Sequence, residues 1–282
     1  MNIENRMKSH SGAHVALAAL LVFLAQSAFA QPVAGILGIA REIAPIEQRL
    51  KDSREVSVRG YVFHVGTLDG RTIVVGRSGV GKVNAAIITT LMIGEFKPRV
   101  VLFSGTAGAI DPALRPGDVV IATSVAQHDA GSQTADGIRL RGLRNAVTGE
   151  VDPLLVPTPE PLLSLARRSA KELRLPSVRI GNEDHLPRIV EGVIVTGDVF
   201  VSDEVRRETL RSTLGATAVE MEGAAVVQTC RQFGVSCLVV RGITDRADGQ
   251  AQDSYDRFIA AASEHAARLV TAIVAGLGER TP

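Results

Sequence analysis

Two carboxylates stand close together in the segment AVEMEGAAVV (residues 218–227), where Glu220 and Glu222 lie on either side of Met221. Small and apolar residues surround both, although carboxylates are seldom buried without a partner. Glu220 is expected to pair with a basic residue inside the fold, and Arg241 on the next strand is the candidate. Glu222, at the start of a helix, is favoured by the positive end of the helix dipole. Glu222 can instead face a cleft, where its two oxygens suit two adjacent hydroxyls of a neutral polyol.

A third carboxylate, Asp245, ends the apolar segment VVRGITD. Aspartate is a preferred N-cap of helices, so Asp245 is a candidate for capping the helix that follows. A carboxyl group at a strand end can also protonate a leaving group. Both interpretations remain open from the residues alone.

Other chemistry-bearing residues carry weaker signals. The segment GRSGVGKV (residues 76–83) nearly matches a phosphate-binding loop, but Val83 stands where Mg²⁺ needs a hydroxyl. A tight turn with a solvated Lys82 is expected there instead. His185 is expected in a solvated loop rather than as a metal ligand. Cys230 and Cys237 are expected to be small buried residues that do not meet, although an exported protein permits a disulfide between them. No metal site is predicted.

The elements that must position these groups alternate between apolar strands and amphipathic helices. This order predicts an α/β fold with a mostly parallel sheet covered by helices on both faces. Ligands of such sheets bind at the carboxyl ends of the strands. Residues 55–79 are expected to form a two-stranded hairpin around Asp69-Gly70, a strand is expected to run through VEGVIVTGDVFV, and Ser202 is expected to cap the next helix.

Composition excludes several functions. The chain has 282 residues, 45% of them apolar, a net charge of +1 and no Trp. Neither nucleic acid nor an acidic membrane surface is therefore an expected partner. Residues 1–30 combine basic residues, a short apolar run and the small-x-small sequence AFA, which predicts a cleaved secretory signal. The expected mature chain is a single domain (residues 31–282), periplasmic or secreted, with no stable membrane anchor.

A family resemblance adds to these interpretations. The segments GILG, SGVGKVNAA, VVLFSGTAGAI, PGDVVIA, HDA, VTGDVFV, AVEMEGAAVVQ and VVRGITDRAD follow one another along most of the chain. Together they resemble the nucleoside phosphorylase superfamily, and within it the bacterial 5′-methylthioadenosine/S-adenosylhomocysteine nucleosidases. The resemblance implies a three-layer α/β sandwich with a mixed, mostly parallel central sheet, usually in a homodimer. It also implies hydrolysis of the N-glycosidic bond of adenine (thio)nucleosides without any cofactor.

The same resemblance implies roles for individual residues. Asp245 matches the general acid that protonates purine N7. Glu222 matches the group that takes the 2′ and 3′ hydroxyls of ribose. The other matches are substrate contacts: Phe200 and Val201 around adenine, Met221 at the ribose, Thr106 and Arg241 around the nucleophilic water, and Val80 and Tyr255 in the apolar pocket for the 5′-alkylthio group.

The residue that activates water is less directly matched, because the segment GIARE is one residue shorter than the family pattern. Matching from the helix side assigns this role to Glu42, and matching from the strand side assigns it to Ile43. Glu42 is preferred because an apolar residue cannot activate water.

Two other functions remain open. A purine nucleoside phosphorylase would need basic residues for phosphate, and Arg41 and Arg77 stand in suitable loops, although Glu42 would repel phosphate. A non-catalytic exported nucleoside-binding protein is the other alternative, and the presence of Asp245 and Glu222 argues against it.

Overall fold

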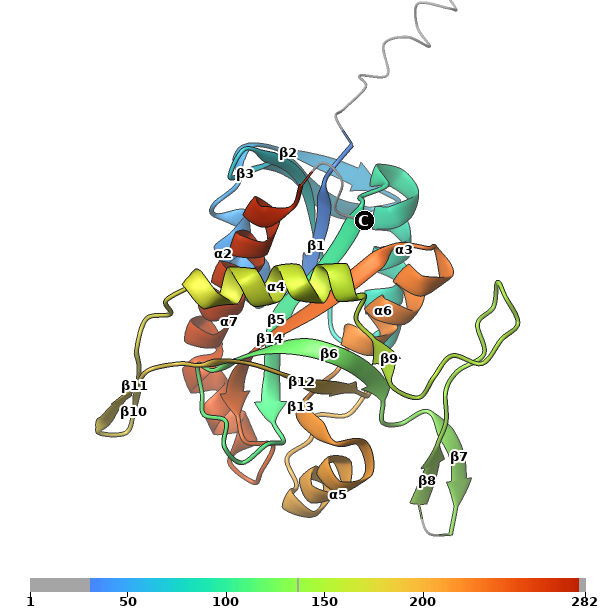
Figure 1. Cartoon of the computed structure of the whole chain (residues 1–282), viewed down its shortest axis with the longest axis vertical. Coiled ribbons are helices and arrows are strands. Elements are labelled where there is room, and N and C mark those ends of the chain that lie inside the picture. The colour runs from blue at the N-terminus through green and yellow to red at the C-terminus, as the bar shows by residue number, and fades with distance from the viewer. Residues whose placement is uncertain (1–30, 136, 279–282) are drawn as a thin grey trace, which may run out of the picture. The chain divides into compact units, whose positions relative to one another are not determined.

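The computed structural model describes residues 31–135 and 137–278. The predicted signal sequence lies outside these residues. One large sheet organises the described chain, with the strand order β13-β12-β6-β14-β5-β1-β4-β3-β2 (Figure 1). Its strands are β1 (Ala34–Gly38), β2 (Lys51–Val58), β3 (Tyr61–Leu68), β4 (Arg71–Arg77), β5 (Val100–Ala109), β6 (Val119–Gln127), β12 (Ile189–Thr196), β13 (Ala216–Glu220) and β14 (Ser236–Asp245), with the short β9 (Val156–Pro157) beside β6.

The sheet is mixed and mostly parallel around its centre. Strand β5 runs parallel to β1 and β14, and β12 runs parallel to β6 and β13. Strand β14 meets β6 in the antiparallel sense. Strand β13 also pairs with the end of β5, so β5, β14, β6, β12 and β13 close into a ring. This closure brings the end of β13, with Glu220, beside the ends of β5 and β14.

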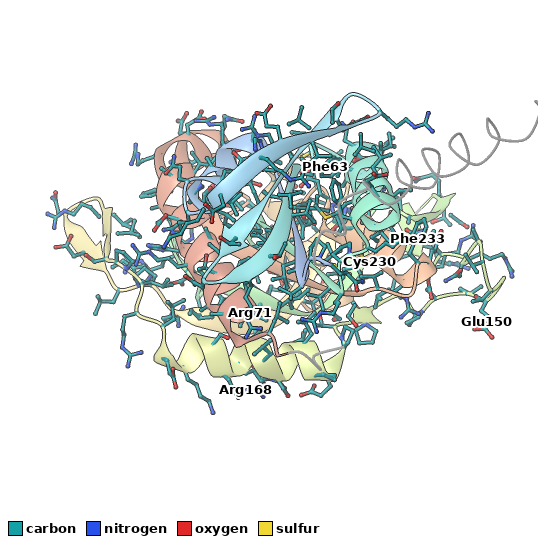
Figure 2. All side chains as sticks on the ribbon, turned by 90° about the horizontal axis from the view of Figure 1, so that it is seen from above. Phe63, Arg71, Glu150, Arg168, Cys230 and Phe233 are labelled. Atoms are coloured by element: carbon teal, nitrogen blue, oxygen red, sulfur yellow. The ribbon has the colours of Figure 1, made fainter. Side chains whose placement is uncertain are left out.

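Helices cover both faces of the sheet, which confirms the three-layer α/β architecture (Figures 1 and 2). Helices α3 (Lys82–Phe96) and α6 (Gly223–Gln232) pack together on one face. Helices α2 (Ala40–Glu47), α4 (Glu160–Glu172) and α7 (Ala251–Gly276) cover the other, and α5 (Glu204–Leu214) packs beside β13. Strand β5 has apolar residues on both of its faces, so both faces must be covered. Val101 and Phe103 face the layer of α3 and α6, and Val100 and Leu102 face the layer of α2, α4 and α7, as strand alternation requires.

Helix α7 is long and apolar enough to cross a membrane by length and composition, but 61% of its most apolar window is buried within the fold. Its apolar face forms part of the core under β5 and β14. This burial identifies α7 as a core helix. The small elements β7 (Gly131–Thr134), β8 (Gly137–Leu140), β10 (Val178–Ile180) and β11 (Glu183–His185) form two separate hairpins.

The structure corrects four local expectations about the elements. The predicted two-stranded hairpin is a three-stranded meander, because residues 51–58 add β2 to β3 and β4. Strand β12 ends at Thr196, so GDVFV is a loop. The N-cap of α5 is Asp203, whose side chain accepts from the Arg206 amide at 2.7 Å, and not Ser202. Helix α7 begins at Ala251, with Gln250 as its N-cap, so the capping interpretation of Asp245 is wrong.

Four side chains also differ from expectation. Lys82 is not solvated, because its ammonium group donates to Asp129 and Gln127. His185 is not solvated either, since its Nε2 lies 2.7 Å from the buried Asp118. The free, buried thiols of Cys230 and Cys237 do meet through a hydrogen bond, contrary to expectation. Cys230 and Phe63, both labelled in Figure 2, belong to the same part of the core.

Candidate active site

The carboxyl ends of the central strands surround a pocket of about 290 Å³. Strand ends from β5, β13 and β14, the loops after β1, β4 and β12, and the first turn of α7 all contribute. The lining residues are Ile39, Glu42, Val80, Thr106, Ala107, Phe200, Val219, Glu220, Met221, Glu222, Thr244, Gln252 and Tyr255. The predicted composite site at the strand ends therefore exists as one cavity.

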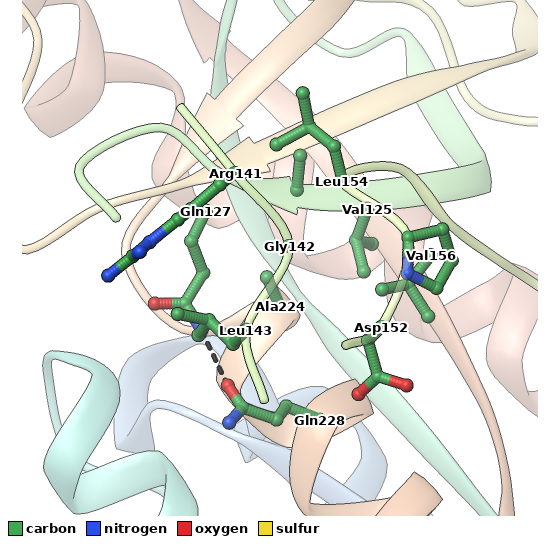
Figure 3. A pocket seen from close by; sticks show the side chains of 12 residues that line it. Val125, Gln127, Arg141, Gly142, Leu143, Asp152, Leu154, Val156, Ala224 and Gln228 are labelled. Atoms are coloured by element: carbon green, nitrogen blue, oxygen red, sulfur yellow. Dashed lines mark hydrogen bonds between the residues drawn. The ribbon is translucent and has the colours of Figure 1, made fainter. Parts of the chain in front are cut away.

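Two other cavities lack this combination of groups. A groove of about 540 Å³ beside α4 has one carboxylate, Glu191, which is engaged by Arg167 at 2.8 Å. A pocket of only about 30 Å³ lies between β6, α6 and the loop near Leu143 and Asp152 (Figure 3). It is too small for a nucleoside. Of these three cavities, the strand-end pocket alone gathers several carboxylates in its lining.

Glu42 lies on α2 and reaches the end of β5. Its Oε1 accepts a hydrogen bond from the Thr106 amide at 3.0 Å and a second from the Thr106 hydroxyl. Burial raises the pKa of Glu42, and the nearby Arg241 charge and the bonds from Thr106 oppose this rise. A fixed carboxylate with an elevated pKa is suited to accept a proton. The assignment from the helix side therefore puts the carboxylate in the pocket, whereas Ile43 lies in the apolar core.

Glu220 lines the pocket, and the buried Arg241 lies directly behind it. The Arg241 Nη2 donates to Glu220 Oε2 at 2.5 Å, and the Arg241 side chain is 1% exposed. The guanidinium also lies 4.0 Å from the centre of the Phe103 ring. Glu220 accepts further bonds from the amides of Glu222 and Gly223. The expected partner of Glu220 is thus confirmed, and breaking such a buried pair usually costs about 3–5 kcal/mol.

Glu222 faces the pocket from the start of α6. Its side chain does not cap its own helix, and its Oε1 accepts from the Gly81 amide at 2.8 Å. Burial, followed by the charge of Glu220, raises the pKa of Glu222 to about 8. A pKa of about 8 keeps Glu222 mostly protonated at neutral pH, so that it can exchange hydrogen bonds with hydroxyl groups.

Asp245 lies directly behind the lining residue Thr244. The Thr244 hydroxyl donates to Asp245 Oδ2 at 2.7 Å, and the Ala247 amide donates to Oδ1 at 2.8 Å. Burial raises the pKa of Asp245 despite these two bonds. A buried carboxyl group that retains its proton to higher pH is suited to act as a general acid.

The mouth of the pocket is apolar. The Phe200 and Tyr255 rings meet edge to face, with centroids 6.3 Å apart and planes at 82°. Phe200 is 45% exposed and Val80 is 53% exposed, so both present apolar surface at the opening. An aromatic pair with open edges can hold a planar ring by stacking.

The structure brings seven of the ten candidate residues onto the pocket lining. Arg241, Asp245 and Val201 do not line it: the first two lie directly behind lining residues, and Val201 packs into the small core around α5. Sequence reasoning missed the lining residues Ile39, Ala107, Val219, Thr244 and Gln252. Thr244 had a usable signal, because it directly precedes Asp245 at a strand end. No group of three or more His, Cys, Asp or Glu side chains suited to a metal ion occurs within residues 31–135 and 137–278.

Comparison with known proteins agrees with this geometry. The phosphorylase superfamily model matches residues 32–275, and the chain belongs to that superfamily. Within it, the chain is an N-glycosidase of purine nucleosides, as its relatives are. The 5′-methylthioadenosine/S-adenosylhomocysteine nucleosidase of Staphylococcus carnosus is 35% identical over 245 residues, which cover 86% of this chain and 99% of the relative.

Two solved structures are also similar. Futalosine hydrolase of Helicobacter pylori has a TM-score of 0.73 and 35% identity, with 88% of this chain and 99% of that chain covered. The 5′-methylthioadenosine/S-adenosylhomocysteine nucleosidase of Neisseria meningitidis, in complex with methylthio-immucillin-A, has a TM-score of 0.73 and 32% identity, with 88% and 100% covered. These two relatives are named for different substrates.

Proposed function

We propose that this protein hydrolyses the N-glycosidic bond of adenine (thio)nucleosides such as 5′-methylthioadenosine and S-adenosylhomocysteine and releases adenine. The observation that carries the proposal is the arrangement of Glu42, Glu222 and Asp245 around one pocket whose mouth is aromatic. Three acidic groups with raised pKa values in one site can serve as general base, as ribose-binding group and as general acid.

Each acidic group has a distinct task in this mechanism. Asp245 protonates N7 of the purine, which makes the base a better leaving group. Positive charge then develops on the sugar, and the carboxylates near the ribose stabilise it. Glu42 accepts a proton from the attacking water, which Thr106 and Arg241 help to hold in place. Glu222 binds the two ribose hydroxyls beside Met221.

The remaining candidates bind the rest of the substrate. Phe200 stacks on the base, and the backbone near Val201 contacts the edge of the base. Val80 and Tyr255 enclose the 5′ substituent. Gln252 also lines the pocket beside Tyr255, so it adds a polar group to the substrate site.

Hydrolysis is favoured over phosphorolysis by the position of the two candidate arginines. Arg77 is held by both oxygens of Glu47 at 2.9 Å, and this contact raises the pKa of Arg77. Neither Arg41 nor Arg77 lines the pocket. The polar group that lines the pocket beside β1 is Glu42, and a carboxylate repels phosphate.

A futalosine-type nucleosidase is the second candidate substrate class, because the similarity to futalosine hydrolase equals that to the methylthioadenosine nucleosidases. The deciding experiment incubates purified protein with methylthioadenosine, S-adenosylhomocysteine or futalosine, with and without phosphate, and measures the released base. Adenine released from methylthioadenosine at a rate independent of phosphate supports the proposal. Strict dependence on phosphate, or cleavage of futalosine alone, contradicts it.

A further inference from the structure

Three charged residues from distant segments meet outside the pocket lining. Lys82 begins α3, Asp129 follows β6 and Asp198 follows β12. The Lys82 ammonium group donates to Asp129 Oδ1 at 2.7 Å, and the Lys82 amide donates to Asp198 Oδ1 at 2.8 Å. The Asp198 amide donates to Asp129 Oδ2 at 3.0 Å. Each residue therefore contacts the other two, and we call this set the charged clasp.

The charged clasp connects the two ends of the proposed substrate site. Asp198 opens the loop that carries Phe200, which lines the pocket mouth. On the other side, Lys82 follows Gly81, whose amide donates to Glu222. Gly81 has a left-handed φ of 89°, and a Cβ there would lie 3.0 Å from Asp198 Oδ1. A side chain at position 81 would therefore strain the backbone and press on the clasp.

Further hydrogen bonds connect the charged clasp to β6 and α6. Lys82 also donates to Gln127 Oε1 at 3.1 Å, and Gln127 in turn donates to Gln228 on α6 at 2.7 Å (Figure 3). The side chains of Lys82 and Asp129 are only 20% and 23% exposed. Burial alone would raise the pKa of Asp129, but the bonds from Lys82 and Asp198 outweigh it and lower the pKa. Asp129 is therefore held in its charged form.

We propose that Lys82, Asp129 and Asp198 are positioning residues. They hold the loop that carries Phe200 at a fixed position relative to Glu222. The clasp contacts no lining carboxylate through its own side chains, so it acts through the backbone at Gly81 and at the loop start. The effect of the charged clasp on catalysis rests on the proposed function. The presence of the clasp and its effect on the Phe200 loop are independent of the proposed function.

The test compares Asp129→Asn with a matched control, Asp152→Asn. Asp152 forms an ion pair with Arg231 that is also 2.7 Å long, and it lines the small pocket of Figure 3 and not the strand-end pocket. Hydrogen exchange is followed by mass spectrometry in peptides covering residues 79–84 and 197–203. Asp129→Asn should increase exchange in both peptides, because an amide oxygen replaces the carboxylate that holds Lys82 and the Asp198 amide. Asp152→Asn should leave both peptides as in the parent protein.

The catalytic arm measures KM and kcat for methylthioadenosine. Asp129→Asn should raise KM about tenfold, the scale expected for a half-buried charge-assisted hydrogen bond, and should change kcat less. Lys82→Met should raise KM for methylthioadenosine to a similar extent. The charge-conserving Lys82→Arg should have a KM close to that of the parent protein.

The outcomes separate the clasp from the proposed function. Unchanged exchange in both peptides of Asp129→Asn overturns the clasp, whatever the activity. Increased exchange with a parent-like KM overturns its positioning role. A parent protein that cleaves no nucleoside contradicts the proposed function, and the exchange data then still decide whether the clasp holds the loop.

Discussion

Asp245 is the residue on which the distinction between an enzyme and a binding protein depends most directly. Its carboxyl group is buried, and burial raises its pKa, so it keeps its proton to higher pH than an exposed aspartate does. Asp245→Asn keeps the shape and a hydrogen-bond donor but cannot deliver a proton. We expect base release to slow by roughly 10²-fold or more while nucleoside binding persists.

This expectation is checked by single-turnover kinetics together with calorimetric binding of methylthioadenosine. Asp152→Asn is the control, because Asp152 lies outside the pocket lining. Parent-like base release by Asp245→Asn would remove Asp245 from the mechanism.

Glu222 predicts the pH dependence of the reaction. Only the ionised carboxylate can accept a hydrogen bond from each ribose hydroxyl at once and oppose the charge on the sugar. With a pKa of about 8, the ionised fraction increases as the pH rises through that value. We expect kcat/KM to increase between pH 7 and pH 9, and Glu222→Gln to lose this increase together with most of its turnover. A pH profile of Glu222→Gln with the same shape as that of the parent enzyme would exclude an ionised Glu222, because any change that comes from Asp245 or Glu42 appears in both proteins.

The same shift has a consequence for stability. The folded-state pKa of Glu222 is raised from 4.5 to about 8, so the folded protein holds a proton that the unfolded chain releases within this window. The contribution of Glu222 to stability is therefore lost as the pH rises from about 4.5 to 8. Glu222→Gln should raise the melting temperature relative to the parent more at pH 8 than at pH 5. An equal effect at both pH values would show that Glu222 does not carry the shifted proton.

At the scale of elements, the stability of helix α5 is expected to depend on its N-cap residue. Asp203 caps α5 through the Arg206 amide, whereas the neighbouring Ser202 does not. Asp203→Ala should therefore lower the free energy of unfolding by about 0.5–2 kcal/mol, and the control Ser202→Ala should have little effect. Urea denaturation measures both, and a larger loss in Ser202→Ala would contradict the cap.

At the scale of the whole molecule, we propose a homodimer formed through the α3–α6 layer. Val83 is 70% exposed, Ile87 is 39% exposed, and Phe233, just after α6, is 50% exposed. Exposed apolar residues on the helices of one layer often mark an interface. Light scattering should give a dimer for the parent and a monomer for Val83→Glu, and Leu186→Glu, at a site 74% exposed on another part of the surface, should remain dimeric. A monomeric parent would exclude the dimer.

Export of the whole protein is a prediction that rests on residues 1–30. The AFA sequence predicts cleavage before Gln31 and a periplasmic or secreted mature protein. Intact-mass measurement on protein from the exported fraction should show the loss of residues 1–30. Full-length chain recovered only from the cytosol would contradict export.

The order of motifs, the α/β class and the Glu220–Arg241 pair follow from the sequence, because they depend on local periodicity and on charges that burial forces together. The tertiary structure decides the rest of the site. Glu222 obtains its bond from Gly81, 141 positions away, and Glu42 obtains its bonds from Thr106, 64 positions away. The parallel pairing of β1 with β5 places Glu42 beside Thr106, and the pairing of β13 with β5 places Glu222 at the same strand ends. Such contacts depend on strand order, register and the closing of the strand ring, which arise from the packing of distant segments and leave no signal in neighbouring residues.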